Sequence, residues 1–225
     1  MGGYYERHLS GSRLEQVYAL ASPRIRQYLR AETDQVIQRI HGVTRVLELG
    51  CGYGRVLREI APHVGRAIGN DTSRASLVLA SSNLADLSNC DLVRMDAARL
   101  AFPEAVFDAT ICVQNGISAF GVDRQKLVAE AVRVTRNSGI VLFSTYSPRI
   151  WPDRLDWFRT QSRAGLLGEL DETRSRDGTI ACKDGFRSEA VSEAELRALF
   201  ETLAQEVRVY EVDGSSMFAE AVRTD

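Results

Sequence analysis

The sequence has few lysines and no excess of basic residues. Lys126 and Lys183 are its only lysines, and the 28 basic residues are outnumbered by 30 acidic ones, which gives a formal charge of −2. Proteins that bind nucleic acid usually carry a basic excess that neutralises phosphates. Nucleic acid is therefore not an expected partner.

Long apolar runs and paired cysteines are missing as well. No apolar run reaches the roughly 20 residues needed to span a bilayer, and residues 1–10 lack the apolar core of a signal peptide. The cysteines contain no C-x-x-C pair, so their spacing indicates neither a zinc site nor a disulfide framework. We expect a cytoplasmic protein with no metal and no membrane partner. The four cysteines are Cys51, Cys90, Cys112 and Cys182.

The sequence is rich in alternating strand and helix patterns. Apolar residues recur every three or four positions over residues 12–41, which predicts two helices divided at Ser22-Pro23. The alternation that follows predicts a parallel sheet with helices on both faces, a doubly wound α/β fold. The predicted strands are residues 45–49, 66–70, 90–94, 107–113 and 140–144, and the predicted helices are residues 55–61, 73–84 and 123–135.

The last third of the chain departs from this alternation. Residues 151–167 have a helical pattern, and Asp177-Gly178 is a hairpin signal that predicts pairing of residues 169–173 with residues 179–183. Ser192 and Glu195 fit a capping box, which predicts a helix through Leu203.

A second hairpin is predicted at the end of the chain. Residues 206–212 and 216–223 are strand-like and meet at Asp213-Gly214, so they give the parallel sheet an antiparallel edge. We therefore expect one structural domain in two parts. Residues 1–44 form a helical cap, and residues 45–225 form the main domain with a lid or insertion near residues 146–190.

The strongest chemical signal is a glycine-rich turn after the first predicted strand. The segment Val46-Leu47-Glu48-Leu49-Gly50-Cys51-Gly52-Tyr53-Gly54 combines a strand, an acidic residue and a G-x-G-x-G turn. Glycines let a ligand approach the main chain, and the following helix start supplies unpaired N–H groups. A dinucleotide-binding turn has G-x-G-x-x-G, but Arg55 stands where its last glycine would fall. The acid and this spacing favour a cationic amino group over a pyrophosphate.

Two further acids follow the next two predicted strands. Asp71 ends the second strand about twenty residues after the turn, where an acid accepts hydrogen bonds from ribose hydroxyls. Asp96 follows the third strand. Because parallel strands end at one edge of the sheet, we expect both acids to share a crevice with Glu48.

These motifs resemble those of the class I S-adenosylmethionine-dependent methyltransferases over residues 45–145. The resemblance implies a Rossmann-like seven-stranded sheet in the order 3-2-1-4-5-7-6, with the last strand antiparallel. It also implies S-adenosylmethionine as cofactor and S-adenosylhomocysteine as product. The segments that carry it are Glu48–Gly54, Gly69-Asn70-Asp71-Thr72-Ser73, Met95-Asp96-Ala97 and Phe107-Asp108.

The resemblance further implies roles for single residues. Glu48 and the backbone of Gly50, Cys51, Gly52 and Gly54 would hold the methionine end of the cofactor. Asp71 would bind the ribose hydroxyls, with Thr72 at the ribose edge. Asp96 and the Ala97 N–H would bind adenine, with Met95 packed on the ring, and Gln114 would lie beside the sulfonium.

The class of methyl acceptor is inferred by excluding classes whose motifs the sequence lacks. Gln114-Asn115-Gly116-Ile117-Ser118 follows the fourth strand, where amino-methyltransferases acting on nucleic acid bases carry Asn/Asp-Pro-Pro-aromatic. The paired glutamates of protein arginine methyltransferases and the acidic cluster of metal-dependent O-methyltransferases are missing too. We therefore expect a small-molecule acceptor and in-line methyl transfer, in a monomer or homodimer. The acceptor-side candidates are Gln114, Asn115, Tyr18, Tyr146 and Arg24, and further lid candidates are Tyr28, Trp151, Trp157 and Lys183.

Other functions stay open at this stage. A protein that binds S-adenosylmethionine without catalysis has the same motifs, and a nucleotide-dependent oxidoreductase has a related fold with different glycine spacing. The histidines give no general base by position. We expect His41 and His63 at the far edge of the sheet, whereas His8 lies in a segment that could reach the site.

Overall fold

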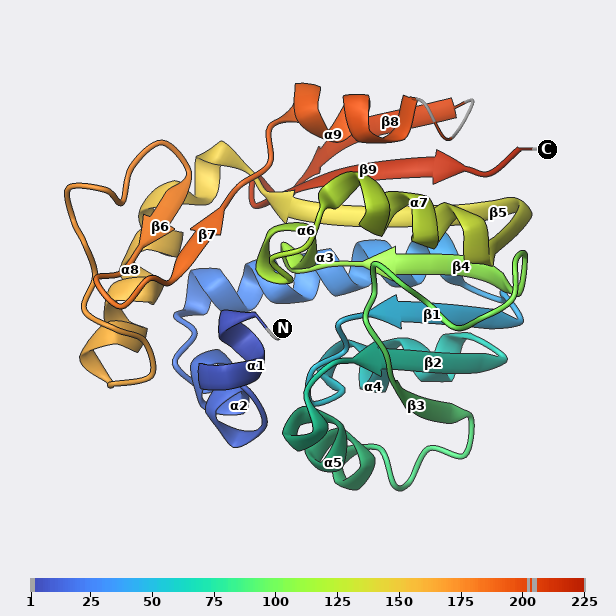
Figure 1. The fold of residues 1–225 in the computed structure, drawn as a ribbon, viewed down its shortest axis with the longest axis horizontal. Coiled ribbons are helices and arrows are strands. Elements are labelled where there is room, and N and C mark those ends of the chain that lie inside the picture. The colour runs from blue at the N-terminus through green and yellow to red at the C-terminus, as the bar shows by residue number, and fades with distance from the viewer. Residues whose placement is uncertain (1–2, 202, 204–205, 225) are drawn as a thin grey trace.

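A central sheet with helices on both faces forms the body of the computed structural model, which describes residues 3–201, 203 and 206–224 (Figure 1). The strands of the sheet are β1 (Arg45–Leu49), β2 (Arg66–Asp71), β3 (Cys90–Arg94), β4 (Phe107–Cys112), β5 (Thr135–Tyr146), β8 (Glu206–Val212) and β9 (Ser216–Val222). The helices are α1 (Tyr4–His8), α2 (Ser12–Ala19), α3 (Pro23–Ile40), α4 (Arg55–Ile60), α5 (Arg74–Asn83), α6 (Gly116–Ala119), α7 (Arg124–Val134), α8 (Trp151–Arg163) and α9 (Glu193–Glu201), with 3-10 turns η1 (Ala61–His63) and η2 (Pro148–Ile150).

The order of the strands confirms the predicted topology. The seven-stranded sheet runs β3-β2-β1-β4-β5-β9-β8. The strands from β1 to β5 are parallel, and β9 is antiparallel to β5 and to β8. Because two short strands outside the sheet come before β8 in the chain, β8 and β9 are the sixth and seventh strands of the sheet. The order is therefore 3-2-1-4-5-7-6 with an antiparallel edge.

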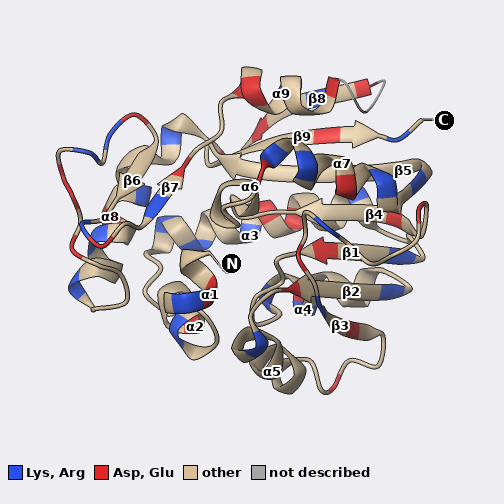
Figure 2. Ribbon diagram, viewed as in Figure 1, with Lys and Arg blue, Asp and Glu red and all other residues tan. Residues whose placement is uncertain are grey.

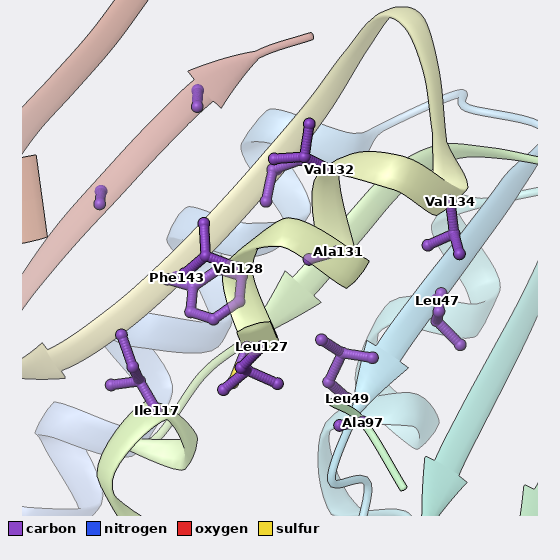
Figure 3. Close-up of a cluster of buried hydrophobic side chains, with 14 of the residues drawn as sticks. Leu47, Leu49, Ala97, Ile117, Leu127, Val128, Ala131, Val132, Val134 and Phe143 are labelled. Carbon is purple, nitrogen blue, oxygen red and sulfur yellow. The ribbon is translucent and has the colours of Figure 1, made fainter. Parts of the chain in front are cut away.

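Alternate residues of the central strands point to opposite faces of the sheet and pack into two hydrophobic cores, one on each face. In β1, Leu47 and Leu49 pack with α7 and α9 on one face of the sheet (Figure 3). Val46 packs with α3, α4 and α5 on the opposite face. This alternation follows from the two-residue period of a strand. Glu48 shares the face of Val46 and is the one charged residue in an otherwise apolar strand end.

A third cluster lies beyond the carboxyl ends of the parallel strands. It joins α1, α2, the first half of α3, α8 and the small sheet of β6 (Thr179–Ala181) and β7 (Arg187–Glu189). Figure 1 shows α1, α2 and α8 gathered in front of the strand tips. Ser22 caps α3 by accepting a hydrogen bond from the Ile25 N–H, as the Ser22-Pro23 break predicts. The division into a cap of residues 1–44, whose first two residues lie outside the described residues, and a main domain stays a prediction.

The predicted pairing around Asp177-Gly178 is confirmed only in part. The turn exists, since both residues have positive φ, and Leu170 forms an antiparallel bridge with Cys182, flanked by hydrogen bonds from Lys183 N–H to the Glu169 carbonyl and from Asp171 N–H to the Ala181 carbonyl. The pairing does not extend to residues 172 and 173, and β6 forms its longer ladder with β7. The backbone of residues 172 and 173 is drawn into a local turn because the Asp171 carboxylate accepts hydrogen bonds from the N–H groups of Thr173 and Arg174.

Three further elements differ in length from their predictions. β5 starts at Thr135 instead of residue 140, with a register shift in its pairing to β4. α8 ends at Arg163. α9 is described to Glu201, and residue 202 of the predicted helix through Leu203 lies outside the described residues. No helix in the described part of the chain is long and apolar enough to cross a membrane.

Candidate functional site

A cleft opens at the carboxyl ends of β1, β2 and β4, beneath α1, α2 and α8. Its volume, counted out to the open mouth, is about 1400 Å³. The predicted cofactor-binding residues that line it are Glu48, Gly50, Cys51, Gly52, Asp71, Thr72, Asp96, Ala97 and Gln114.

The glycine-rich turn forms the floor of the cleft. Gly50 and Gly52 line it with φ of 72° and 56°, a left-handed backbone that favours glycine. A Cβ on Gly50 would lie 2.3 Å from the Phe120 ring. Gly54 also has positive φ, but it does not line the cleft. It begins α4 and donates its N–H to the Cys51 carbonyl, so its position is structural.

Glu48 and Arg55 each place a polar atom without a hydrogen-bond partner at the cleft. Glu48 is buried, and its Oε2 has no hydrogen-bond partner. Burial raises its pKa to about 8, an effect that the positive charge of Arg55 opposes and the negative charge of Asp71 supports. Arg55 Nη2 is likewise buried and unpartnered. A ligand with an amino group and a carboxylate would satisfy both atoms.

Asp71 connects the turn to the end of β2. Its Oδ2 accepts the Gly52 N–H at 2.9 Å and its Oδ1 accepts the Ser73 N–H at 2.7 Å. Burial raises its pKa, while these two hydrogen bonds act in the opposite direction. Each carboxylate oxygen keeps a second lone pair for a ligand hydroxyl. Thr72 is exposed at the rim of the cleft.

Met95, Asp96 and Ala97 line the cleft from the segment that follows β3. Asp96 is exposed, and its Oδ1 accepts the Ala98 N–H at 2.9 Å. Ala97 is buried and Met95 is half-buried. The side chain of Asn70 donates to the Met95 carbonyl at 3.1 Å and thereby fixes this segment to the end of β2. The arrangement offers a flat surface and a carboxylate at the rim.

Gln114 is held by a buried acid that the sequence analysis did not select. Glu32 of α3 accepts hydrogen bonds from the Gln114 side chain at 3.0 Å and from the Ser144 hydroxyl at 2.6 Å. Burial raises the pKa of Glu32, and these hydrogen bonds act in the opposite direction. The sequence did carry a signal, because Glu32 lies between Leu29 and Val36 on the apolar face of its helix.

The other acceptor-side candidates divide between the cleft and its surroundings. Tyr18, Tyr146 and Trp157 line it. Asn115 does not, because its amide is buried between Thr145 and Ser188. Arg24 is outside too, because it pairs with Asp213 at 2.6 Å.

Three lid candidates and the histidines also lie outside the cleft lining. Tyr28 packs behind Tyr146, Trp151 joins the third cluster, and Lys183 pairs with Glu169 on the surface. None of the three histidines lines the cleft. Among the described residues, no group of His, Cys, Asp and Glu side chains is arranged to hold a metal ion.

The fold and the cleft define an α/β protein with a candidate ligand site at the carboxyl edge of the sheet. Residues 46–139 match a family model described as a methyltransferase domain. The matched segment and the strand order thus identify a methyltransferase domain of Rossmann-like fold over residues 46–139. Acidic residues lie near the strand tips in Figure 2. No curated protein has a significant sequence match to the chain.

Many solved structures share this fold at low sequence identity. A protein of Pyrococcus horikoshii has a TM-score of 0.66 and 18% identity, over 91% of this chain and 93% of that one. A magnesium protoporphyrin IX methyltransferase of Synechocystis, with bound S-adenosylhomocysteine, has a TM-score of 0.63 and 16% identity, over 95% and 94%. The N-methyltransferase NodS of Bradyrhizobium japonicum, in complex with S-adenosylhomocysteine, has a TM-score of 0.60 and 16% identity, over 95% and 99%.

Proposed function

We propose that this chain transfers the methyl group of S-adenosylmethionine to a small-molecule acceptor. The observation that carries the proposal is the pair of unpartnered buried atoms, Glu48 Oε2 and Arg55 Nη2, in a cleft that also holds Asp71 and Asp96. Glu48 would accept from the amino group of the cofactor and Arg55 would donate to its carboxylate. Asp71 would bind the ribose hydroxyls, and Asp96 would accept from the adenine amino group.

The remaining residues of the cleft would align the acceptor and exclude water. When bound, S-adenosylmethionine supplies an activated methyl group, so in-line displacement needs mainly alignment and a dry site. Gln114, held by Glu32, would fix the wall beside the reacting centre. The lid formed by α1, α2 and α8 would close the cleft above the acceptor. A general base is not required for an acceptor that is nucleophilic at neutral pH.

A small acceptor is supported by the shape of the cleft and by the charge of the chain. The cleft lies beneath α1, α2 and α8, and side chains of all three helices line it. Basic and acidic segments are interspersed in Figure 2, and the formal charge of −2 gives no excess for binding a phosphate backbone. The absence of nucleic acid and membrane partners, the cytoplasmic location and the monomeric or dimeric state remain predictions.

Asp71→Ala tests the cofactor assignment. Two charge-assisted hydrogen bonds at about 1.5–3 kcal/mol each would be lost, which corresponds to an S-adenosylhomocysteine Kd at least about 100-fold higher. Titration calorimetry measures this Kd. The control is Asp86→Ala, because Asp86 is an exposed partner of Arg58, and we expect it to leave the Kd unchanged. Equal affinity of wild type and Asp71→Ala would refute the assignment.

A labelled-methyl assay tests catalysis separately from binding. The wild type is incubated with S-adenosylmethionine labelled in the methyl group and with a set of small phenols, amines and thiols. Label transfer to any of them supports the proposal. Binding of S-adenosylhomocysteine with no transfer to any acceptor would favour a non-catalytic cofactor-binding protein, and binding of NAD instead would favour an oxidoreductase.

A further inference from the structure

The cleft has two halves of different chemistry. Its charged side chains are Glu6, Glu48, Arg55, Asp71 and Asp96. Four of them surround the proposed cofactor site, and Glu6 belongs with them, because it raises the pKa of Asp71 and lies 3.7 Å from Arg94. The other half is lined by aromatic and aliphatic side chains from α1, α2, β5 and α8. These are Tyr5, Leu9, Val17, Tyr18, Tyr146, Trp157, Phe158 and Gln161.

The aromatic rings of this half pack against one another at tilted and edge-to-face angles and form an apolar wall of the cleft. The ring centroids of Tyr18 and Trp157 are 5.8 Å apart, and those of Trp157 and Phe158 are 5.9 Å apart. The indole N–H of Trp157 is already used, since it donates to the Val17 carbonyl at 3.1 Å. The ring is thereby fixed in orientation and presents only apolar surface to the cleft. Flat ring systems stack on such surfaces.

Gln161 supplies one unused polar atom in this apolar half. Its side chain is 1% exposed, it lines the cleft, and its Nε2 has no hydrogen-bond partner. A buried donor without a partner is unfavourable, whereas an oxygen on a bound molecule would satisfy it. A ligand that binds here would therefore be stabilised by an oxygen placed next to Gln161 Nε2.

The charges near the aromatic half argue against a charged acceptor. No carboxylate lines it to pair with an ammonium group. Arg154 is buried behind it, with its guanidinium 4.0 Å from the Tyr146 ring centroid. The guanidinium donates to the carbonyls of Gly178 and Ser188, and Arg154 does not line the cleft, so it is not placed to bind a ligand carboxylate. Arg55, whose guanidinium lies 5.0 Å from the Tyr18 ring centroid, is already assigned to the carboxylate of the cofactor. The positive charge of Arg154 also repels an ammonium group. Burial raises the pKa of Tyr18 and of Tyr146, which keeps both phenols neutral.

We propose, resting on the function proposed above, that the acceptor is an uncharged flat ring compound that carries an oxygen. It binds in the aromatic half of the cleft, against the side chains of Tyr18, Trp157 and Phe158, and its oxygen accepts a hydrogen bond from Gln161 Nε2. Gln161 is then a specificity-determining residue for the acceptor and has no part in cofactor binding.

Three phenols that differ only in their para substituent test the acceptor class. The protein is saturated with S-adenosylhomocysteine, and calorimetry at about pH 6.5, where a phenol stays protonated, gives the Kd of each phenol. The phenols are 4-hydroxyacetophenone, which is uncharged, 4-hydroxybenzoate, which is anionic, and tyramine, which is cationic. We expect 4-hydroxyacetophenone to bind at least about 10-fold more tightly than the other two.

Gln161→Met tests the hydrogen bond with little change in volume. Loss of one donor should weaken 4-hydroxyacetophenone about 3- to 10-fold and leave the S-adenosylhomocysteine Kd unchanged. Gln161→Glu, which replaces the donor with a carboxylate, should weaken it at least as much and serves if the first variant does not fold. The control is Gln16→Met, because Gln16 is exposed on α2 and outside the cleft lining.

The outcomes separate this inference from the proposed function. Failure of the wild type to bind S-adenosylhomocysteine would overturn both. If S-adenosylhomocysteine binds, tighter binding of tyramine or 4-hydroxybenzoate, or no binding of any of the phenols, would overturn only the acceptor class. An unchanged Kd for 4-hydroxyacetophenone in both Gln161 variants would overturn the role of that residue.

Discussion

Glu48 shows how one buried side chain couples ligand binding to protons. Its pKa of about 8 means that the free protein holds it mostly protonated at pH 7. A bound amino group favours the ionised form. We therefore expect S-adenosylhomocysteine binding near pH 7 to release up to one proton. Calorimetry in buffers with different ionisation enthalpies measures the released fraction.

Glu48→Gln should remove this proton release, because glutamine does not titrate. Glu59→Gln is the matched control, since Glu59 is exposed on α4, outside the cleft lining. The same release from wild type and Glu48→Gln would show that another group exchanges the proton.

Site residues that follow from local sequence patterns were predicted, whereas those that depend on distant contacts were not. Glu48 and Asp71 were found because each lies at the carboxyl end of a strand that the apolar pattern predicts clearly. Parallel strands end at the same edge of the sheet, so the two side chains were expected to lie together. Arg24 pairs with Asp213, 189 positions further along the chain. Gln161 matters because its amide is buried without a partner. Pairing and burial of this kind depend on tertiary packing, which local spacing does not contain.

At the scale of elements, the turn between β1 and α4 gives a prediction with an internal control. Gly52 has a φ of 56°, and a Cβ there would lie 2.9 Å from Leu14 Cδ2 on α2. Gly42 has a φ of 79° with no neighbour within 4 Å of a Cβ. Valine at either position costs about 1–2 kcal/mol for a left-handed backbone, so thermal unfolding should show similar losses of stability in both variants.

Only Gly52→Val should also lose cofactor binding, because only Gly52 lines the cleft. Circular dichroism checks that both variants fold, and calorimetry with S-adenosylhomocysteine compares their affinities. Wild-type affinity in Gly52→Val would show that the ligand does not approach the backbone at this turn.

Helices and strands were predicted well where the hydrophobic pattern of the sequence agrees with the burial of the residues in the fold. β1 and β4 have the apolar runs of strands that are buried on both faces, and the structure contains both. The predicted pairing of residues 169–173 is formed only as far as Asp171, because the Asp171 side chain then accepts the N–H groups of Thr173 and Arg174. Composition predicts that a turn exists, whereas the length of the pairing across it is decided by competing local hydrogen bonds.

At the scale of the whole molecule, the topology followed from a small number of rules. Strand–helix alternation, right-handed crossovers and an antiparallel last hairpin leave few arrangements, and the family resemblance gave the order that the sheet has. The lid was predicted only as a region, because α1 and α2 lie far from α8 in the sequence. Their packing depends on the third cluster, which joins Leu9 and Val17 to Trp157 and Phe158.

The acids buried around the site also set how the stability of the whole protein depends on pH. Burial raises the pKa values of Glu32, Glu48 and Asp71, so at these three groups the folded protein binds more protons than the unfolded chain. Their contribution to the free energy of unfolding is then highest below the unfolded pKa and falls as pH rises. For Glu48 this window runs from 4.5 to about 8, with a slope of up to about 1.4 kcal/mol per pH unit.

Saturating S-adenosylhomocysteine should flatten this decline, because its amino group and ribose hydroxyls favour the ionised forms of Glu48 and Asp71. The increase in Tm caused by the ligand should therefore be larger at pH 8 than at pH 5.5, and differential scanning fluorimetry at both values measures it. In Glu48→Gln the increase should differ less between the two pH values. A wild-type increase in Tm that is equal at both would mean that binding does not ionise the buried acids, and that the ligand amino group is held elsewhere.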